Sequence, residues 1–249
     1  MTAPIVYEPR TYRTFDGSRR FATFRVVVET SDLYVKAHML LEKQTEELVR
    51  KCRGQIEEAI AVRPEFLKSF EPLEEDASDS PVVLRMIRAG KKAGTGPMAA
   101  VAGAVAEYVG QGLLRWSPEV IVENGGDIFL KIAEPVIVGL LAGSSPFSGK
   151  LGIRVEPTQI SLGICTSSAT VGPSVSLGRA DAATIVSKDA ALADAMASAL
   201  GNRVKKSSDL RPAVEWAMGI AGVEGALVVF GDRMAALGDV ELVPVSSQT

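Results

Sequence analysis

Cysteine and histidine are scarce in this chain, whose 249 residues include two cysteines, Cys52 and Cys165, and one histidine, His38. Two cysteines are too few for the disulfide framework of a small secreted protein, so a reducing compartment is the default expectation. His38 falls on the polar face of a predicted strand beside Lys36 and Tyr34. We therefore interpret it as a surface residue rather than a catalytic base.

The chain also has no strong net charge and no long apolar run. Its formal charge is −3, which gives no general attraction for nucleic acid or for an anionic membrane. No apolar run approaches membrane-spanning length, and the first residues, MTAPIVYEPRTYRTFDG, contain no apolar signal-peptide core. We expect a cytoplasmic enzyme or binding protein with no nucleic-acid partner and no membrane partner.

What the chain does contain is enough apolar sequence for a large core, because 47% of its residues are hydrophobic and 23% are charged. Alternating and helical periodicities mix along the chain, which favours an α+β fold. Predicted helices cover residues 41–62, 82–93, 98–107, 189–200 and 210–220, with Ser187 as the cap of the fourth. Predicted strands cover residues 21–29, 32–39, 120–123, 127–132, 136–141, 152–156, 159–164, 182–186, 225–230, 233–237 and 240–245.

The sequence Glu123-Asn124-Gly125-Gly126-Asp127-Ile128 lies between two predicted strands. Adjacent glycines let a ligand or another chain segment approach the backbone closely, and an amide and a carboxylate flank them. The local alternative is a plain β-hairpin, for which Asn-Gly is the commonest two-residue signal. Taken alone, the local sequence favours the hairpin.

The predicted helix at 98–107 consists of Ala, Gly and Val after a Gly-Thr-Gly-Pro stretch, and Glu107 is its first charge. Such a helix can pack its backbone unusually close to a neighbour, and its start exposes amide groups that could hold an anion. A buried core helix with no ligand is the alternative, and locally it is favoured.

Three hydroxyl residues, Thr166, Ser167 and Ser168, follow Cys165 at the end of a predicted strand. Hydroxyls there can donate to phosphate, although Ser/Thr turns bond the backbone in the same way with no ligand. A cysteine at a strand end is most often a packing residue, with a reactive thiol as the minority interpretation.

Asp194 and Ser198 lie four residues apart on the predicted helix 189–200, so they share one helix face with small neighbours. If that face is buried, the carboxylate needs a cation or strong donors. Carboxylate and hydroxyl oxygens suit Mg²⁺, which usually takes one or two protein carboxylates and completes its shell with phosphate and water. If the face is exposed, the pair carries no meaning.

Taken in order, these stretches resemble the ApbE-like family, whose best-studied members are FAD:protein FMN transferases. In that family a Gly- and Ala-rich helix with an Ala-Lys-Gly core and a following Asp precedes an Asn-x-Gly-Gly-Asp-Ile turn, as MAAVAGAVAE at 98–107 precedes ENGGDIFL at 123–130 here. The family's Ala-Asp-Ala-x-x-Thr-Ala helix resembles residues 193–199, and its Thr-Ser-Gly strand end resembles residues 166–168. The stretches GTGPMAAVAGAVAE, ENGGDI, ICTSSATVGPS and RADAATIVSKDAALADAMASALGN resemble more closely the ApbE-related branch found in anaerobes and archaea.

The resemblance implies a fold of two T-fold-like halves of antiparallel sheet packed with helices. It implies a single domain over residues 1–249, in which a cleft between two intertwined halves holds FAD, or a related dinucleotide, with its pyrophosphate bridged to Mg²⁺. Asp194 and Ser198 would hold the metal. The residues implied at the nucleotide are Glu107, Asn124, Gly125, Gly126, Asp127, Thr166, Ser167 and Ser168.

The chain departs from the family pattern at several positions. Ala102 stands where the family has its helix lysine, and Glu107 and Ser198 replace an aspartate and a threonine. The transferases' His-x-x-Asp-Pro-x-Thr-Gly segment is reduced to residues 172–178, with Pro173 where the closer branch is expected to have histidine. Without that lysine and histidine, the site could bind a nucleotide without transferring FMN.

Three functions therefore stay open. The first is an FAD- and Mg²⁺-binding protein, active or degenerate as an FMN transferase. The second is a sulfur-handling protein in cysteine or homocysteine assimilation that uses Cys165 as its nucleophile or persulfide carrier, and the third is a non-catalytic binding protein. Candidate partners are a small-molecule dinucleotide, an acceptor protein and a second copy of the chain.

Overall fold

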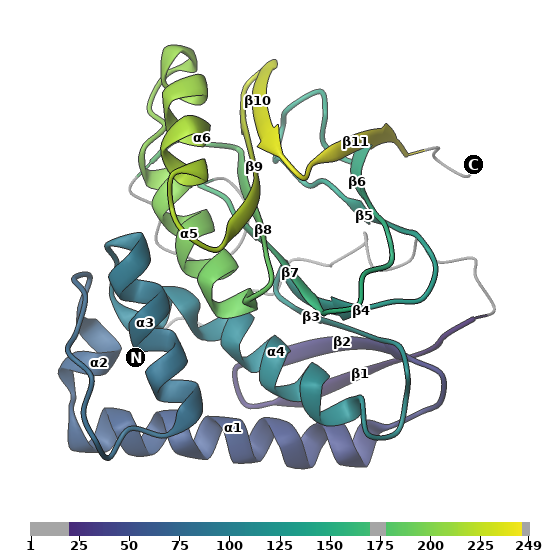
Figure 1. Ribbon diagram of the computed structural model, residues 1–249, viewed down its shortest axis with the longest axis vertical. Coiled ribbons are helices and arrows are strands. Elements are labelled where there is room, and N and C mark those ends of the chain that lie inside the picture. The colour runs from purple at the N-terminus through teal and green to yellow at the C-terminus, as the bar shows by residue number, and fades with distance from the viewer. Residues whose placement is uncertain (1–19, 170–177, 246–249) are drawn as a thin grey trace.

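The structure of the chain is a computed structural model that describes residues 20–169 and 178–245 (Figure 1). Its helices are α1 (Glu42–Val62), α2 (Glu65–Lys68), α3 (Pro81–Ala93), α4 (Val101–Leu113), α5 (Ala190–Asn202) and α6 (Leu210–Met218), with the 3₁₀ turns η2 (Pro97–Ala100) and η3 (Ser207–Asp209). Its strands are β1 (Ala22–Val28), β2 (Ser31–Ala37), β3 (Val120–Asn124), β4 (Asp127–Lys131), β5 (Val136–Gly139), β6 (Leu151–Val155), β7 (Leu162–Ser167), β8 (Ala182–Ser187), β9 (Val223–Phe230), β10 (Arg233–Gly238) and β11 (Glu241–Pro244).

An antiparallel eight-stranded sheet runs through the molecule in the order β1-β2-β3-β4-β7-β8-β9-β10. Each half of this sheet follows the same order along the chain, a strand pair, then helices, then a second strand pair. The α+β class and the two-part architecture predicted from the sequence are therefore confirmed. The two parts join edge to edge where β4 pairs with β7. That a single domain holds a ligand cleft between its two halves stays a prediction.

The long helices cover one face of the large sheet, and the small sheet β11-β6-β5 lies against the other face of its second half (Figure 1). Neighbouring residues of one strand point to opposite faces. Accordingly, Phe129 packs in the core under the helices while Leu130 packs in the core under the small sheet. Burying each such side chain contributes about 1.5–3 kcal/mol.

Glycines let α4 lie unusually close to its neighbours, as its composition predicts. A Cβ atom added at Gly103 would stand 2.2 Å from the carbonyl oxygen of Ala190 in α5. A Cβ atom added at Gly110 would stand 2.1 Å from the ring of Phe129 below. Only a residue without a side chain permits either contact. The helix is therefore a buried core helix, and the same contacts place its first turn against α5.

Two local expectations change in the structure. The N-cap of α5 is Asp189, whose carboxylate accepts a hydrogen bond of 3.0 Å from the N–H of Leu192. The predicted cap, Ser187, ends β8 instead and accepts from the N–H of Asp189. The predicted strands 21–29 and 32–39 place the first hairpin turn at Thr30 and Ser31. In the structure this turn contains Glu29, at a positive φ of 52°, and Thr30, because Ser31 already belongs to β2.

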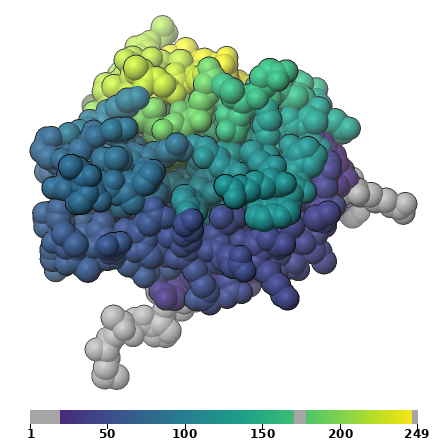
Figure 2. All heavy atoms as spheres, turned by 60° about the horizontal axis from the view of Figure 1, so that its bottom comes forward, coloured from purple at the N-terminus to yellow at the C-terminus, as the bar shows by residue number. Residues whose placement is uncertain are grey.

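Seen from the side of α1, the N-terminal part of the described chain (purple to blue) forms the lower part of the surface, and the C-terminal part (green to yellow) forms the opposite end (Figure 2). The teal middle of the chain lies between them. Within residues 20–169 and 178–245, no helix combines the length and the apolar character needed to cross a bilayer.

Candidate functional site

The two-glycine stretch forms the tight turn between β3 and β4. Gly125 and Gly126 have positive φ angles of 75° and 108°, and Asn124 pairs with Asp127 across the turn. Positive φ at both central positions is the geometry that favours Asn-Gly-Gly here, so the hairpin interpretation is confirmed. The turn also reaches α4, because the Asn124 amide donates a hydrogen bond of 3.2 Å to the Ala102 carbonyl.

A pair of buried carboxylates lies between this turn and the two packed helices. Asp127 begins β4 and is 9% exposed, while Asp194 projects from α5 and is 8% exposed. The Asp194 carboxylate accepts a bond of 2.9 Å from the N–H of Gly103, and the N–H of Ala102 also bonds to it. The amide groups that the sequence suggested for an anion are thus bonded to a carboxylate from α5.

The surroundings of this pair oppose its negative charge. Burial raises the pKa of Asp194 to about 7, against the stabilising bonds from Gly103 and Ala102. Burial, and then the charge of Asp194, raise the pKa of Asp127 well above its usual range. Within the described residues, no lysine, arginine or histidine side chain forms an ion pair with either carboxylate. A cation at this position would therefore stabilise both ionised groups.

Cys165 lies beside the pair with its side chain fully buried. Burial, followed by the charges of Asp127 and Asp194, raises the pKa of its thiol well above the usual range. Its sulfur atom bonds to the Ala190 carbonyl at 3.4 Å, and it also bonds to the Asp127 carboxylate. A buried, protonated thiol is a poor nucleophile, so the geometry gives no support to the sulfur-handling hypothesis.

The hydroxyl residues after Cys165 bond mainly within the protein. The Thr166 hydroxyl lies 2.8 Å from the Thr184 hydroxyl, and the Ser168 hydroxyl donates to the Asp181 carbonyl at 2.7 Å. The predicted strand 159–164 lies too early, because β7 covers Leu162–Ser167, and Ser167 pairs with Ala183 at its end. The contact of this stretch with the carboxylate pair is made by the backbone N–H of Thr166, which bonds to Asp127.

Glu107, which the resemblance implies at the nucleotide, bonds to three other residues of the protein. Its carboxylate is buried on α4, where it pairs with Arg85 of α3 and accepts a bond of 2.8 Å from the side chain of Gln111. Its other oxygen accepts a bond of 2.8 Å from the N–H of Ala190, the first residue of α5. Burial raises the pKa of Glu107, and the charge of Arg85 opposes that shift.

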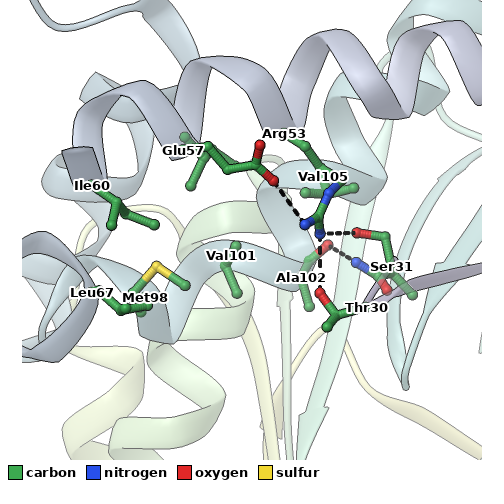
Figure 3. A pocket seen from close by; sticks show the side chains of 12 residues that line it. Thr30, Ser31, Arg53, Glu57, Ile60, Leu67, Met98, Val101, Ala102 and Val105 are labelled. Carbon is green, nitrogen blue, oxygen red and sulfur yellow. Dashed lines mark hydrogen bonds and ion pairs between the residues drawn. The ribbon is translucent and has the colours of Figure 1, made fainter. Parts of the chain in front are cut away.

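A pocket of about 290 Å³ opens next to the start of α4 (Figure 3). Its wall is apolar where Ile60, Leu67 and Met98 line it, and polar at the other end, where Arg53 bonds to Thr30, Ser31 and Glu57. Val101, Ala102 and Asn124 line its side nearest the β3–β4 turn. The pocket therefore touches the predicted site at Asn124.

The donor set at the carboxylate pair is sparse for a metal held by protein alone. In the described part of the chain, no three His, Cys, Asp or Glu side chains gather so as to hold an ion. Asp194 and the partly buried Ser198 lie one turn apart on α5, and Asp127 lies beside Asp194. Mg²⁺ accepts such a set when phosphate and water complete its shell, so the residues fit this ion together with a phosphorylated ligand.

Two features of the site escaped the sequence. Arg85, which neutralises Glu107, lies 22 positions earlier on another helix, so the sequence offers no local signal for it. Neither of the two lysines near the end of α3, Lys91 and Lys92, pairs with Asp127 or Asp194 in the described chain. Instead, Lys91 pairs with Glu74 and Lys92 bonds to the carbonyl of Ala221.

Away from this site, His38 is less isolated than its sequence position indicates. Its ring lies 2.8 Å from the buried carboxylate of Glu119, which also pairs with Arg20 and accepts from the backbone of Ala133. This cluster lies at the opposite end of β3 from Asn124.

The family model described as "AbpE bacteria" matches residues 13–218 of the chain. A UPF0280 protein from Methanocella arvoryzae is 46% identical over 191 residues, which cover 76% of this chain and 78% of that protein. A UPF0280 protein from Methanocaldococcus jannaschii is 38% identical over 227 residues, covering 88% of this chain and 92% of the relative.

Solved structures share the fold at much lower sequence identity. The flavin transferase ApbE from Vibrio cholerae superposes with a TM-score of 0.58 at 12% identity, covering 88% of this chain and 97% of that one. The apo form of the flavinyl transferase ApbE from Pseudomonas stutzeri gives 0.55 at 14% identity, covering 88% and 94%. At such identities these matches establish the architecture.

Proposed function

The chain belongs to the AbpE bacteria family, and from that membership and its carboxylate pair we propose that it binds FAD, or a closely related dinucleotide, together with Mg²⁺. Solved structures of the same fold include proteins described as flavin and flavinyl transferases. Transfer of FMN to a hydroxyl group of an acceptor protein is the activity that follows most directly from this kinship.

The observation that carries the proposal is the pair Asp127 and Asp194. Burial alone makes the ionisation of one carboxylate cost several kcal/mol. A second buried carboxylate beside it raises this cost further, and no cation of the described chain offsets it. Such a pair beside the start of α4 is costly unless a bound cation compensates its negative charge. A divalent ion accounts for both groups at once.

The ligand's phosphates account for the rest of the shell. Mg²⁺ supplies charge neutralisation to a pyrophosphate when both are bound. Asp194 and Ser198 would provide protein oxygens to the ion from consecutive turns of α5, with Asp127 beside them. The Gly125–Gly126 turn would present backbone without side chains to the ligand, and a Cβ added at Gly126 would already contact the Thr166 carbonyl oxygen at 3.6 Å.

The pocket beside α4 suits one ring system of a dinucleotide. Its volume of about 290 Å³ lies just below the range of about 300–1,000 Å³ typical of sites for drug-sized ligands, so the whole of FAD does not fit inside it. Its apolar wall and polar end match a flat heteroaromatic ring with hydrogen-bonding edges. The rest of the ligand would extend past Asn124 toward the carboxylate pair.

Binding without transfer is the second candidate function, and Ala102 favours it. Ala102 replaces the family's lysine at the start of α4, which removes one cation from the expected phosphate position. Pro173, which replaces the expected histidine, lies outside the described residues. Complete transfer would form a bond from the acceptor hydroxyl oxygen to the FMN phosphorus, break the pyrophosphate bond and release AMP and a proton.

Calorimetric titration of the purified chain with FAD, with and without Mg²⁺, tests the proposal. We expect binding that requires Mg²⁺. The same mixture, incubated with candidate acceptor proteins and assayed for AMP, separates a transferase from a binding protein. Absence of binding at millimolar FAD with Mg²⁺ present would contradict the proposed function.

A further inference from the structure

We propose that Glu107 is a positioning residue that holds the first turn of α5, and with it Asp194, against the start of α4. The inference uses the proposed function only to name the ligand whose binding would respond. Its geometric basis is the set of contacts around one backbone unit, that of Ala190.

Ala190 is held from several directions by residues far from it in sequence. Its N–H donates to the Glu107 carboxylate at 2.8 Å, and its carbonyl lies 3.4 Å from the Cys165 sulfur. Gly103 and Gly163 face it without side chains, since a Cβ added to them would lie 2.2 Å and 2.4 Å from its backbone atoms. Ala190 therefore has little freedom to move.

Asp194 lies one helical turn after Ala190, so a shift of the first turn displaces the Asp194 carboxylate with it. The contacts of Asp194 with the amides of Ala102 and Gly103 depend on this placement. Groups that bind or orient a reacting ligand tolerate little misplacement, and an error of about 1 Å can cost a factor of about 100 in rate.

Both Glu107 oxygens are already used within the protein. One accepts from Arg85 and Gln111, and the other accepts from Ala190. These bonds occupy most of the acceptor sites of the carboxylate, and its side chain is only 4% exposed, which leaves little room for direct contact with a nucleotide. The bonds favour an indirect role, in which Glu107 fixes α5 and Arg85 compensates the buried charge.

The test compares two variants of Glu107. Glu107→Leu removes the oxygen atoms that accept the hydrogen bond from Ala190, at similar side-chain volume, and Glu107→Gln keeps one such oxygen. In the metal-free and ligand-free protein, NMR-detected exchange of the Ala190 amide should be faster in Glu107→Leu by a factor of about 100 and changed little in Glu107→Gln. Calorimetry with FAD and Mg²⁺ should then show affinity lowered at least about tenfold in Glu107→Leu and within about threefold of wild type in Glu107→Gln, the range typical of residues that orient a metal ligand.

A second pair of variants keeps the test decisive if Glu107→Leu does not fold. Arg85 is 38% exposed at its side chain, so Arg85→Met should fold, leave Glu107 without its cation, accelerate exchange at Ala190 and weaken ligand binding. Arg85→Lys should restore both. Unchanged Ala190 exchange and affinity in Glu107→Leu or in Arg85→Met would overturn the inference.

The outcomes also separate this inference from the proposed function. If both Glu107 variants lose binding while Ala190 stays protected, Glu107 touches the ligand itself and the positioning role is wrong. If the wild type binds no FAD with Mg²⁺, the proposed function fails, and the exchange rates still decide whether Glu107 positions α5.

Discussion

The N-termini of α4 and α5 are each held by a carboxylate from the other helix, yet the two carboxylates meet opposite surroundings. Glu107 of α4 bonds to the first N–H of α5, and Asp194 of α5 bonds to the N–H groups at the start of α4. Arg85 and Gln111 donate to Glu107. Beside Asp194 lies a second carboxylate, Asp127, and no cationic side chain of the described chain pairs with it.

This difference is the basis on which we propose a structural role for Glu107 and an ion-binding role for Asp194. A carboxylate at a helix N-terminus is favourable because the N–H groups and the helix dipole attract it. At Glu107, burial and, more weakly, the nearby Asp189 carboxylate raise the pKa of the carboxyl, and the charge of Arg85 lowers it. Two carboxylates with no cation exceed what the helix end requires, so the surplus at Asp194 points to an external ion.

We expect the largest effect from a substitution at the close contact between α4 and α5. Gly103→Ala places a Cβ about where the Ala190 carbonyl lies, so we expect a loss of roughly 3 kcal/mol or more in the free energy of unfolding. Gly54→Ala on the exposed face of α1 is the matched control, because nothing lies within 4 Å of its added Cβ. It should stabilise by about 0.5–1 kcal/mol. Urea denaturation measures both, and equal effects would contradict the close packing.

The pH dependence of the metal-free protein should sharpen the contrast. Because the pKa of Asp194 is about 7 in the folded protein and near 3.8 in the unfolded chain, the folded state holds the proton more tightly between these values. Stability should therefore fall as pH rises from about 4 to 7. Asp194→Asn should reduce that fall, leaving the part due to Asp127 and Glu107, whose pKa values burial also raises. Thermal unfolding in EDTA across this range measures it, and a wild-type slope in Asp194→Asn would refute the assignment.

Removing a single hydroxyl at the Asp194 end should have a moderate effect. Ser198→Ala should lower Mg²⁺-dependent FAD affinity by about tenfold, which is about 1.4 kcal/mol, because water can replace one neutral ligand of this ion. Ser208→Ala, an exposed serine of η3, serves as the control and should bind like wild type. Equal affinities for the two variants would remove Ser198 from the ion's shell.

The smallest expected signal concerns the two thiols, which should not react in the folded protein. Cys52 and Cys165 are both fully buried, and burial raises the pKa of Cys52 to about 12 and that of Cys165 well above its usual range. A thiol reagent should detect no cysteine under native conditions and both after denaturation. If one thiol of the wild type reacted rapidly under native conditions, and this reaction were lost in Cys165→Ala, the sulfur-handling hypothesis would be supported again.

Local chemistry explains how much of the fold could be read from the sequence. The β3–β4 turn follows from the two glycines, which adopt its positive φ angles without steric cost, and from the Asn-Gly pair that is typical of hairpins. The buried α4 follows from its Ala, Gly and Val composition. The N-cap of α5 could not be chosen, since Ser187 and Asp189 are both good caps and only the end of β8 decides between them.

The candidate site was predictable only in part, for a similar reason. The sequence could group Asp127 with Asp194 through a family resemblance, but it could not show which carboxylate has a counter-ion. Glu107 and Asp194 look alike as single acids on small-residue helices. Their difference comes from Arg85, and α3 reaches Glu107 only through packing between helices distant in sequence.

The most direct test of the account is calorimetric titration of Asp194→Ala with FAD in the presence of Mg²⁺, beside wild type and Asp232→Ala. Asp232 is an exposed carboxylate in the β9–β10 turn and matches the change in charge. We predict that wild type and Asp232→Ala bind FAD only with Mg²⁺ and that Asp194→Ala loses at least about 100-fold in affinity, equivalent to about 2.7 kcal/mol. Unchanged Mg²⁺-dependent binding in Asp194→Ala would contradict the claim that this helix end holds the ion.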